Sequence, residues 1–119
     1  MATTITLTGT LEDLFRAAAQ REGVSIEALA ERRLEESELL WRIQTAAPSS
    51  ETREFHRLLR LQRNGALTEL DRETLLELID RRERRAAQRM EDLAALARLR
   101  RISVRELMDQ LGIRPIATP

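Results

Sequence analysis

The chain has 119 residues with twenty acidic and twenty basic side chains, so its formal net charge at pH 7 is zero. It has no cysteine and a single histidine, which excludes disulfides and thiolate metal sites and leaves too few ligands for a histidine metal site or a Ser–His–Asp triad. No apolar run approaches the roughly 20 residues of a membrane helix and no secretory signal is visible, so we expect a cytoplasmic protein without a membrane partner.

A short alternating segment opens the chain. Threonine and apolar residues alternate strictly in it: Thr4, Ile5, Thr6, Leu7, Thr8. Such alternation is typical of a β-strand with one buried face. A lone strand leaves its backbone donors and acceptors unpaired. We therefore expect this strand to pair antiparallel with the same strand of a second copy, which predicts a homodimer.

Two helices are predicted next. The first is expected to begin with Thr10 as its N-cap and to end at Gly23, because glycine adopts the left-handed conformation without steric cost. Ser25 is the predicted N-cap of the second helix, which runs to the break before Pro48. The residues expected in the dimer core are Ile5, Leu7, Leu14, Phe15 and Leu29.

The segment "TITLTGTLEDLFRAAAQREGVSIEALAERRL" resembles the ribbon-helix-helix family over roughly residues 3–36. In that family a two-stranded ribbon enters the DNA major groove and reads base edges. The resemblance implies that Thr4, Thr6 and Thr8 contact bases and that the backbone at Ser25 holds a phosphate. The expected fold class is therefore mostly α, with an N-terminal ribbon-helix-helix dimer.

The pattern of the second half of the sequence predicts only helices. A helix is expected over about 51–63, and a turn at Asn64-Gly65 follows it. Thr68 is the predicted N-cap of a long helix over 69–101, whose length indicates a helical hairpin or a coiled-coil-like arm. Ser103 caps a last short helix that stops at Gly112. The expected domains are a ribbon-helix-helix module over 1–46, a linker over 47–52 and a helical partner-binding region over 53–119.

Charge is spread unevenly along the chain. Residues 1–50 carry five arginines and eight acidic residues, whereas residues 51–119 carry fifteen arginines and twelve acidic residues. The most basic stretch, "RRERRAAQR", indicates contact with phosphates or with an acidic partner. It is more typical of a solvated helix face, because Glu77 and Asp80 each precede an arginine by four residues. The residues expected to bind a partner are Trp41, Arg81, Arg82, Arg85, Arg89, Leu93, Leu107 and Leu111.

Two hypotheses for function follow. The architecture resembles that of antitoxins, which implies an operator-binding N-terminal dimer, double-stranded DNA as a ligand, and C-terminal helices that bind a toxin. The alternative is a dimeric adaptor or structural protein whose ribbon only dimerises and whose helical arm docks a larger protein. No spacing of acidic residues, nor the lone His56, indicates catalysis, so we expect no enzyme activity, no catalytic residue, no metal and no cofactor.

Overall fold

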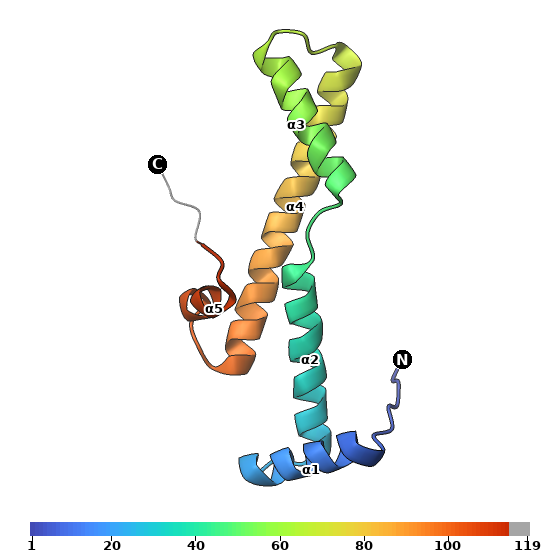
Figure 1. Cartoon of the computed structure of the whole chain (residues 1–119), viewed down its shortest axis with the longest axis vertical. Helices are drawn as coiled ribbons and strands as arrows, with labels where there is room; N and C mark the ends of the chain where they lie inside the picture. Colours follow the sequence, from blue (N-terminus) through green and yellow to red (C-terminus); the bar gives the residue numbers. More distant parts are fainter. Residues whose placement is uncertain (115–119) are drawn as a thin grey trace. The chain divides into compact units, whose positions relative to one another are not determined.

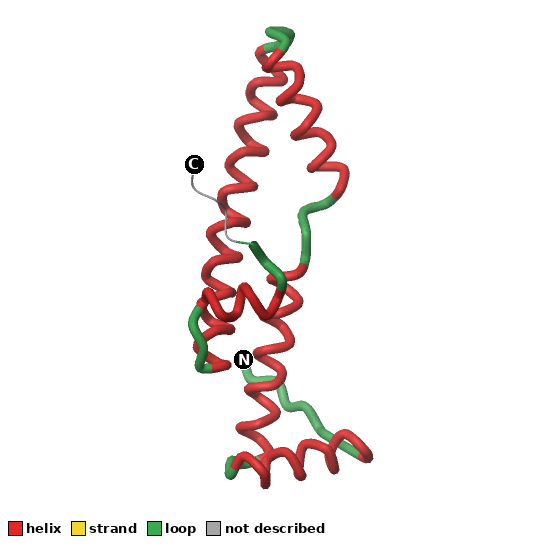
Figure 2. Tube along the Cα trace, turned by 60° about the vertical axis from the view of Figure 1, so that its left-hand side comes forward, coloured by secondary structure: helices red, strands yellow, loops and turns green. Residues whose placement is uncertain are grey.

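A computed structural model describes residues 1–114, which form five helices and no strand (Figures 1 and 2). The helices are α1 (Gly9–Glu22), α2 (Ile26–Gln44), α3 (Ser49–Arg63), α4 (Glu69–Arg100) and α5 (Val104–Leu111). The chain divides into two compact units, which we call the N-terminal unit (Met1–Glu38) and the C-terminal unit (from Leu39 onward). Among the described residues, no helix is both long and apolar enough to cross a membrane.

The predicted N-terminal strand, and with it the ribbon-helix-helix fold, is wrong. Residues 1–8 have no regular secondary structure, and the threonines at 4, 6 and 8 are exposed on it. Ile5 is 64% exposed, so the alternation does not place this side chain in a core. A strand must exchange backbone hydrogen bonds with a neighbour, and residues 1–114 supply no such neighbour. The observed fold class is therefore all-α.

Three of the predicted N-caps are confirmed. The side-chain oxygens of Ser25, Thr68 and Ser103 each accept a hydrogen bond, at 3.1 Å, from the backbone N–H three residues later. The prediction for Thr10 is wrong, because α1 already begins at Gly9 and Thr10 lies inside it. Thr8 occupies the N-cap position in an extended conformation and makes no side-chain capping bond.

Three helices end at a residue in the left-handed conformation, and one of these residues is not glycine. Gly23 and Gly112 end α1 and α5 in the left-handed conformation, with φ of 68° and 70°. α4 ends at Arg101, which has φ of 56° and is the one described non-glycine residue with positive φ. A side chain at such a φ is strained because its Cβ approaches the following carbonyl oxygen. The break expected near Ile102 is therefore present, but an arginine makes it.

The N-terminal unit has a small core. Its buried residues are Ala18, Ala19 and Leu29, against which Phe15 and Ile26 pack. Three further apolar side chains of this unit's helices are about half exposed or more: Leu11, Leu14 and Leu34. The contact between α1 and the first half of α2 therefore buries little apolar surface.

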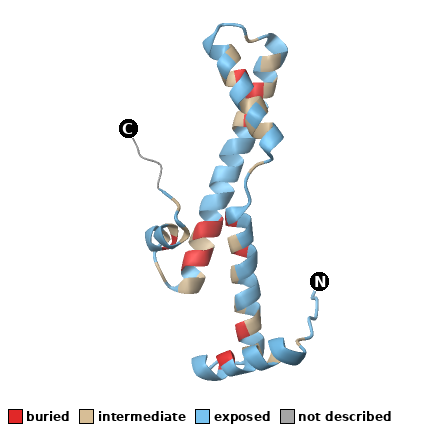
Figure 3. Ribbon diagram, in the orientation of Figure 1, coloured by how far each residue is buried: buried red, intermediate tan, exposed pale blue. Residues whose placement is uncertain are grey.

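The C-terminal unit has two separate cores, one near each end of α4 (Figure 3). Near the start of α4, Leu75 and Leu78 bury Leu58 of α3. Near its end, a cluster joins α4 to α5 and to the last turns of α2. The buried members of that cluster are Leu39, Ile43, Leu93, Leu96, Ala97 and Leu107. The 32 residues of α4 span about 48 Å, and the middle part of the helix separates the two cores.

Candidate interaction groove

The middle of α4 is exposed for about three turns. Twelve consecutive residues, 80–91, are all exposed, and we call them the exposed span. They include five arginines and three acidic residues. A helix inside a compact fold normally keeps one apolar stripe covered along its length. Apart from the contacts that Arg82 and Arg85 make with α3, the exposed span has no packed neighbour in the described part of the chain.

A groove runs beside this span. It is lined on one side by the last turn of α2 and the segment that joins α2 to α3, and on the other by residues 82–92 of α4, and its volume is about 890 Å³. Its lining surface is mostly apolar, with arginines among the residues that form it. Its lining includes Trp41, Ala46, Pro48, Arg85, Ala86 and Arg89. Trp41 is 63% exposed and forms an aromatic wall that is open to solvent.

Asp92 closes one end of the groove. This carboxylate is 5% exposed, and a buried charge is stable only when it is paired. Arg42 places a guanidinium nitrogen 3.0 Å from its Oδ1, and the Gln88 side chain donates a hydrogen bond of 3.1 Å to the same oxygen. The last turns of α2 are thereby fixed against α4, and Trp41 is held next to them.

Two of the groove arginines also hold α3 against α4. Arg85 donates to both carboxylate oxygens of Glu51, at 3.0 and 2.6 Å. These hydrogen bonds lower the pKa of Glu51 below its usual 4.5 and raise the pKa of Arg85. The guanidinium of Arg82 lies 4.2 Å from the centre of the Phe55 ring, in a cation–π contact. Both arginines therefore have structural partners.

Arg81 and Arg89 have no such partner. Within the described residues, neither of them forms an ion pair within 4.0 Å. Arg84 pairs only with Asp80 one turn earlier, at 3.1 Å, and both side chains are largely exposed. Such pairs are weak, because water competes for the charges. The exposed span, with five arginines and three acidic residues, therefore has a net charge of +2 beside the mostly apolar groove, and its carboxylates Glu83 and Glu91 also form no ion pair within the described residues.

The predicted partner-binding residues fall into two groups. Trp41, Arg82, Arg85 and Arg89 line the groove together, and Arg81 lies on the exposed span. The leucines are elsewhere: Leu93 and Leu107 are 1% and 0% exposed in the core of the C-terminal unit, and Leu111 packs against that core. These leucines therefore stabilise the fold of the unit.

The residues predicted for DNA and dimer contacts belong to the N-terminal unit. Ser25 is engaged as an N-cap, and Leu29 and Phe15 pack within the unit's own core. Ile5 and Leu14 are exposed, and Leu7 is partly buried.

Sequence reasoning missed Arg42, Ala46, Pro48 and Asp92. Asp92 had a usable signal: it stands four residues before the buried Leu96, so an acidic residue occupies a core position of α4.

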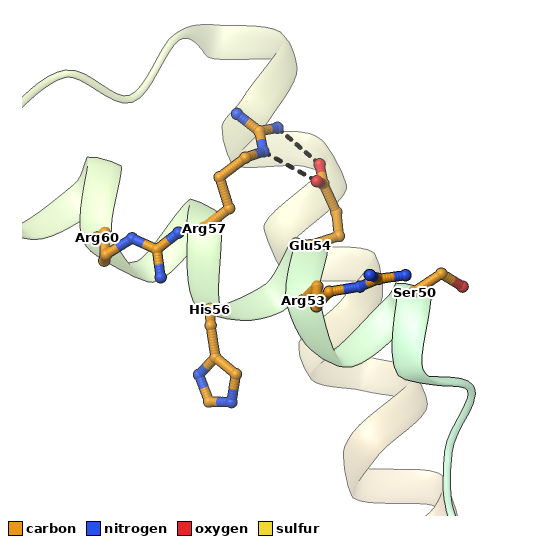
Figure 4. Close-up of a pocket in the computed structure, with 6 residues that line it drawn as sticks. All are labelled: Ser50, Arg53, Glu54, His56, Arg57 and Arg60. Carbon is orange, nitrogen blue, oxygen red and sulfur yellow. Dashed lines mark hydrogen bonds and ion pairs between the residues drawn. The ribbon is translucent and has the colours of Figure 1, made fainter.

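A second concave surface lies on α3, with a volume of about 540 Å³ (Figure 4). Arg57 donates two hydrogen bonds to Glu54, at 2.9 and 2.7 Å, which lower the pKa of that carboxyl and raise the pKa of Arg57. His56 points away from this pair. The lining is completed by Ser50, Arg53 and Arg60, so every wall comes from one helix and none encloses a ligand. In residues 1–114 no group of three His, Cys, Asp or Glu side chains is placed to hold a metal ion.

No protein-family model, no curated protein and no solved structure matches this chain. The comparisons therefore add no support to the resemblance to ribbon-helix-helix proteins, and the function must be argued from the groove itself.

Proposed function

We propose that this chain is a non-enzymatic interaction module that docks an acidic, amphipathic helix of a protein partner in the groove beside α4. The observation that carries the proposal is the exposed span itself. Between the two cores, about three turns of α4 lack the apolar contacts that a continuous buried stripe makes. Another molecule bound along these turns supplies such contacts. A helical partner fits this shape, because helix-in-groove docking needs an apolar floor and a polar rim.

The chemistry of the partner follows from the lining. Positive potential at Arg89, which lines the groove, and at Arg81, which lies on the neighbouring exposed span, attracts acidic side chains and repels basic ones. The apolar surface around Ala86 and Pro48 accepts an aliphatic side chain. Trp41 adds a large aromatic contact of the kind that is enriched in binding hot spots. An acidic helix with leucine on one face satisfies all three features.

The antitoxin hypothesis has two parts, DNA binding through the ribbon and toxin binding through the C-terminal helices, and only the second is compatible with this proposal. DNA reading through a ribbon required the N-terminal strand, which is absent from the described residues. The N-terminal unit is also acidic, with four arginines against eight acidic residues, and a phosphate backbone repels such a surface. Binding of a protein partner by the C-terminal helices is compatible with the groove. A toxin is one partner of this chemistry.

The sole tryptophan of the chain lies in the groove, so its fluorescence reports docking. The probe is a synthetic helical peptide with leucine on one face and glutamate on the other, compared with the same peptide carrying lysine. We expect the acidic peptide to shift Trp41 emission to shorter wavelength and the lysine peptide to leave it unchanged. A matched pair of charge reversals checks the location: Arg89→Glu abolishes the response, and Arg63→Glu, at the exposed end of α3, preserves it.

Duplex DNA is the necessary competitor in this titration. A response of Trp41 to DNA but not to the acidic peptide overturns the proposal, and so does an equal response to both peptides.

A further inference from the structure

We infer that the acidic helix in the groove is α2 of a second copy of this chain, so that two copies form a closed dimer by inserting their α2 helices reciprocally. This inference rests on the proposed function, because it names the partner of the same groove. It stands on charge complementarity between the two units and on the position of two exposed apolar side chains of α2.

The first half of α2 carries a row of unpaired carboxylates. Glu27, Glu31 and Glu35 follow each other in steps of four, and all three are exposed. No ion pair within 4.0 Å joins any of them to a residue in the described part of the chain. Like charges at this spacing repel each other along a helix. We call these three residues the acidic stripe, and a positive surface of another molecule would relieve its repulsion.

The exposed span of α4 has the same spacing with the opposite sign. Arg81, Arg85 and Arg89 also follow each other in steps of four. Each step advances about 6 Å along a helix, so the two rows repeat at equal intervals. The complementarity extends to the whole molecule. The N-terminal unit carries four arginines and eight acidic residues, the C-terminal unit sixteen and twelve, and the chain is neutral.

Two apolar side chains fix the register. Leu34 and Trp41 lie seven residues apart, on the same side of α2, and they are 51% and 63% exposed. When two α2 helices pack antiparallel, Leu34 of each copy meets Trp41 of the other. The two-fold axis then passes beside Ser37, a small exposed residue midway between them.

This register also brings the charges together. In this register Leu34 of one copy lies at Trp41 of the other, so the residues before Leu34 extend past Trp41 along the groove. Glu31 and Glu27 of one copy then run beside Arg89 of the other, whereas Arg85 keeps its pair with Glu51, and the contact repeats by symmetry. Such an interface is isologous and closes at two copies, which is the commonest symmetry of soluble oligomers.

The first test is the mass of the unmodified chain in solution, measured by sedimentation equilibrium at low and high salt. We expect a dimer at about 50 mM salt that dissociates at roughly 1 M, because salt screens exposed charges. Trp41 emission should shift to longer wavelength as the dimer dissociates. A chain that stays monomeric at every concentration tested overturns the inference.

The decisive test mixes two charge-reversed variants, Glu31→Arg and Arg89→Glu. Each variant alone places like charges at both contacts of the dimer, so each should be monomeric. A mixture of the two pairs opposite charges at both contacts, so a mixed dimer should form. Asp13→Arg and Arg63→Glu make the same charge changes at exposed positions outside the acidic stripe and the groove, and both should remain dimeric. Circular dichroism verifies that all four variants keep their helices.

The outcomes separate this inference from the proposed function. The Glu31→Arg variant has an intact and empty groove, so the acidic peptide should shift its Trp41 emission, whereas the unmodified dimer should bind the peptide only as the peptide displaces α2 of the second copy. If that peptide binds and the mixed variants stay monomeric, self-pairing is wrong and the groove serves another protein. If the unmodified chain is dimeric and both reversals leave it so, the dimer uses another surface and the inference is wrong. If the peptide does not bind this monomeric variant, the proposed function fails.

Discussion

The two units of this chain differ in how many apolar side chains they bury. The N-terminal unit buries two alanines and one leucine and leaves Leu11, Leu14 and Leu34 exposed. Among its described residues the C-terminal unit buries nine apolar ones, seven of them leucines, and it leaves Trp41, Leu70, Leu76 and Met90 exposed. Its exposed surface is basic, whereas that of the N-terminal unit is acidic. Most of the stability is therefore expected to reside in the C-terminal unit.

Core truncation gives the largest difference between the units. Leu107→Ala removes a side chain that is 0% exposed and leaves a cavity, so we expect the free energy of unfolding to fall by about 2–5 kcal/mol. Leu14→Ala removes a side chain that is 62% exposed, and a change within about 0.5 kcal/mol is expected for the monomer. Urea unfolding followed by circular dichroism measures both. Equal losses would show that α1 is covered within its own chain.

Helix termination gives a smaller difference of the opposite sign. α1 ends at Gly23, but α4 ends at Arg101 with φ of 56°. Replacing Arg101 with glycine relieves the left-handed strain, and we expect the C-terminal unit to become about 1 kcal/mol more stable. Arg100→Gly places glycine inside the helix and should destabilise the unit by about 0.5–1 kcal/mol. Thermal unfolding of the two variants measures both effects. A loss of stability in both variants would contradict the assignment of strain to Arg101.

Helix initiation compares the units directly. Ser103 accepts the hydrogen bond that caps α5, and Ser103→Ala should cost about 1 kcal/mol. Thr8 holds the same position before α1 without a side-chain bond, so Thr8→Ala should cost only a few tenths of a kcal/mol. Both losses are read from the midpoint of urea unfolding. A full loss at Thr8 would mean that its hydroxyl caps α1 in solution.

These comparisons also show which features the sequence could predict. The caps at Ser25, Thr68 and Ser103 were predictable, because a capping bond joins residues only three positions apart. The strand was not, because strand formation depends on a partner strand and alternation alone does not supply one. The leucines at 93 and 107 show a further limit: an apolar stripe does not reveal whether its own chain covers it.

The groove was predictable only in part. Its arginines and Trp41 stand out in the sequence, and they do line one surface. The opposite wall comes from the segment between α2 and α3, whose approach to α4 depends on the pairing of Arg42 with Asp92 across fifty residues. Such a long-range ion pair has no local signature, so the wall could not be placed from the sequence.

The smallest expected effect concerns the ion pair that supports the groove. The Arg85 hydrogen bonds hold the pKa of Glu51 below 4.5, so the folded chain binds this proton less readily than the unfolded chain. The pair therefore contributes stability above pH 4.5, and the contribution is lost as the pH falls through the lowered folded pKa. We expect Glu51→Gln to reduce the free energy of unfolding slightly at pH 7 and to match the unmodified chain once Glu51 is protonated. Carboxyl NMR of Glu51 should show a midpoint below 4.5 that rises in Arg85→Gln. A midpoint that Arg85→Gln leaves unchanged would show that Arg85 does not hold Glu51 in solution, and that α3 keeps its place on α4 through its leucines alone.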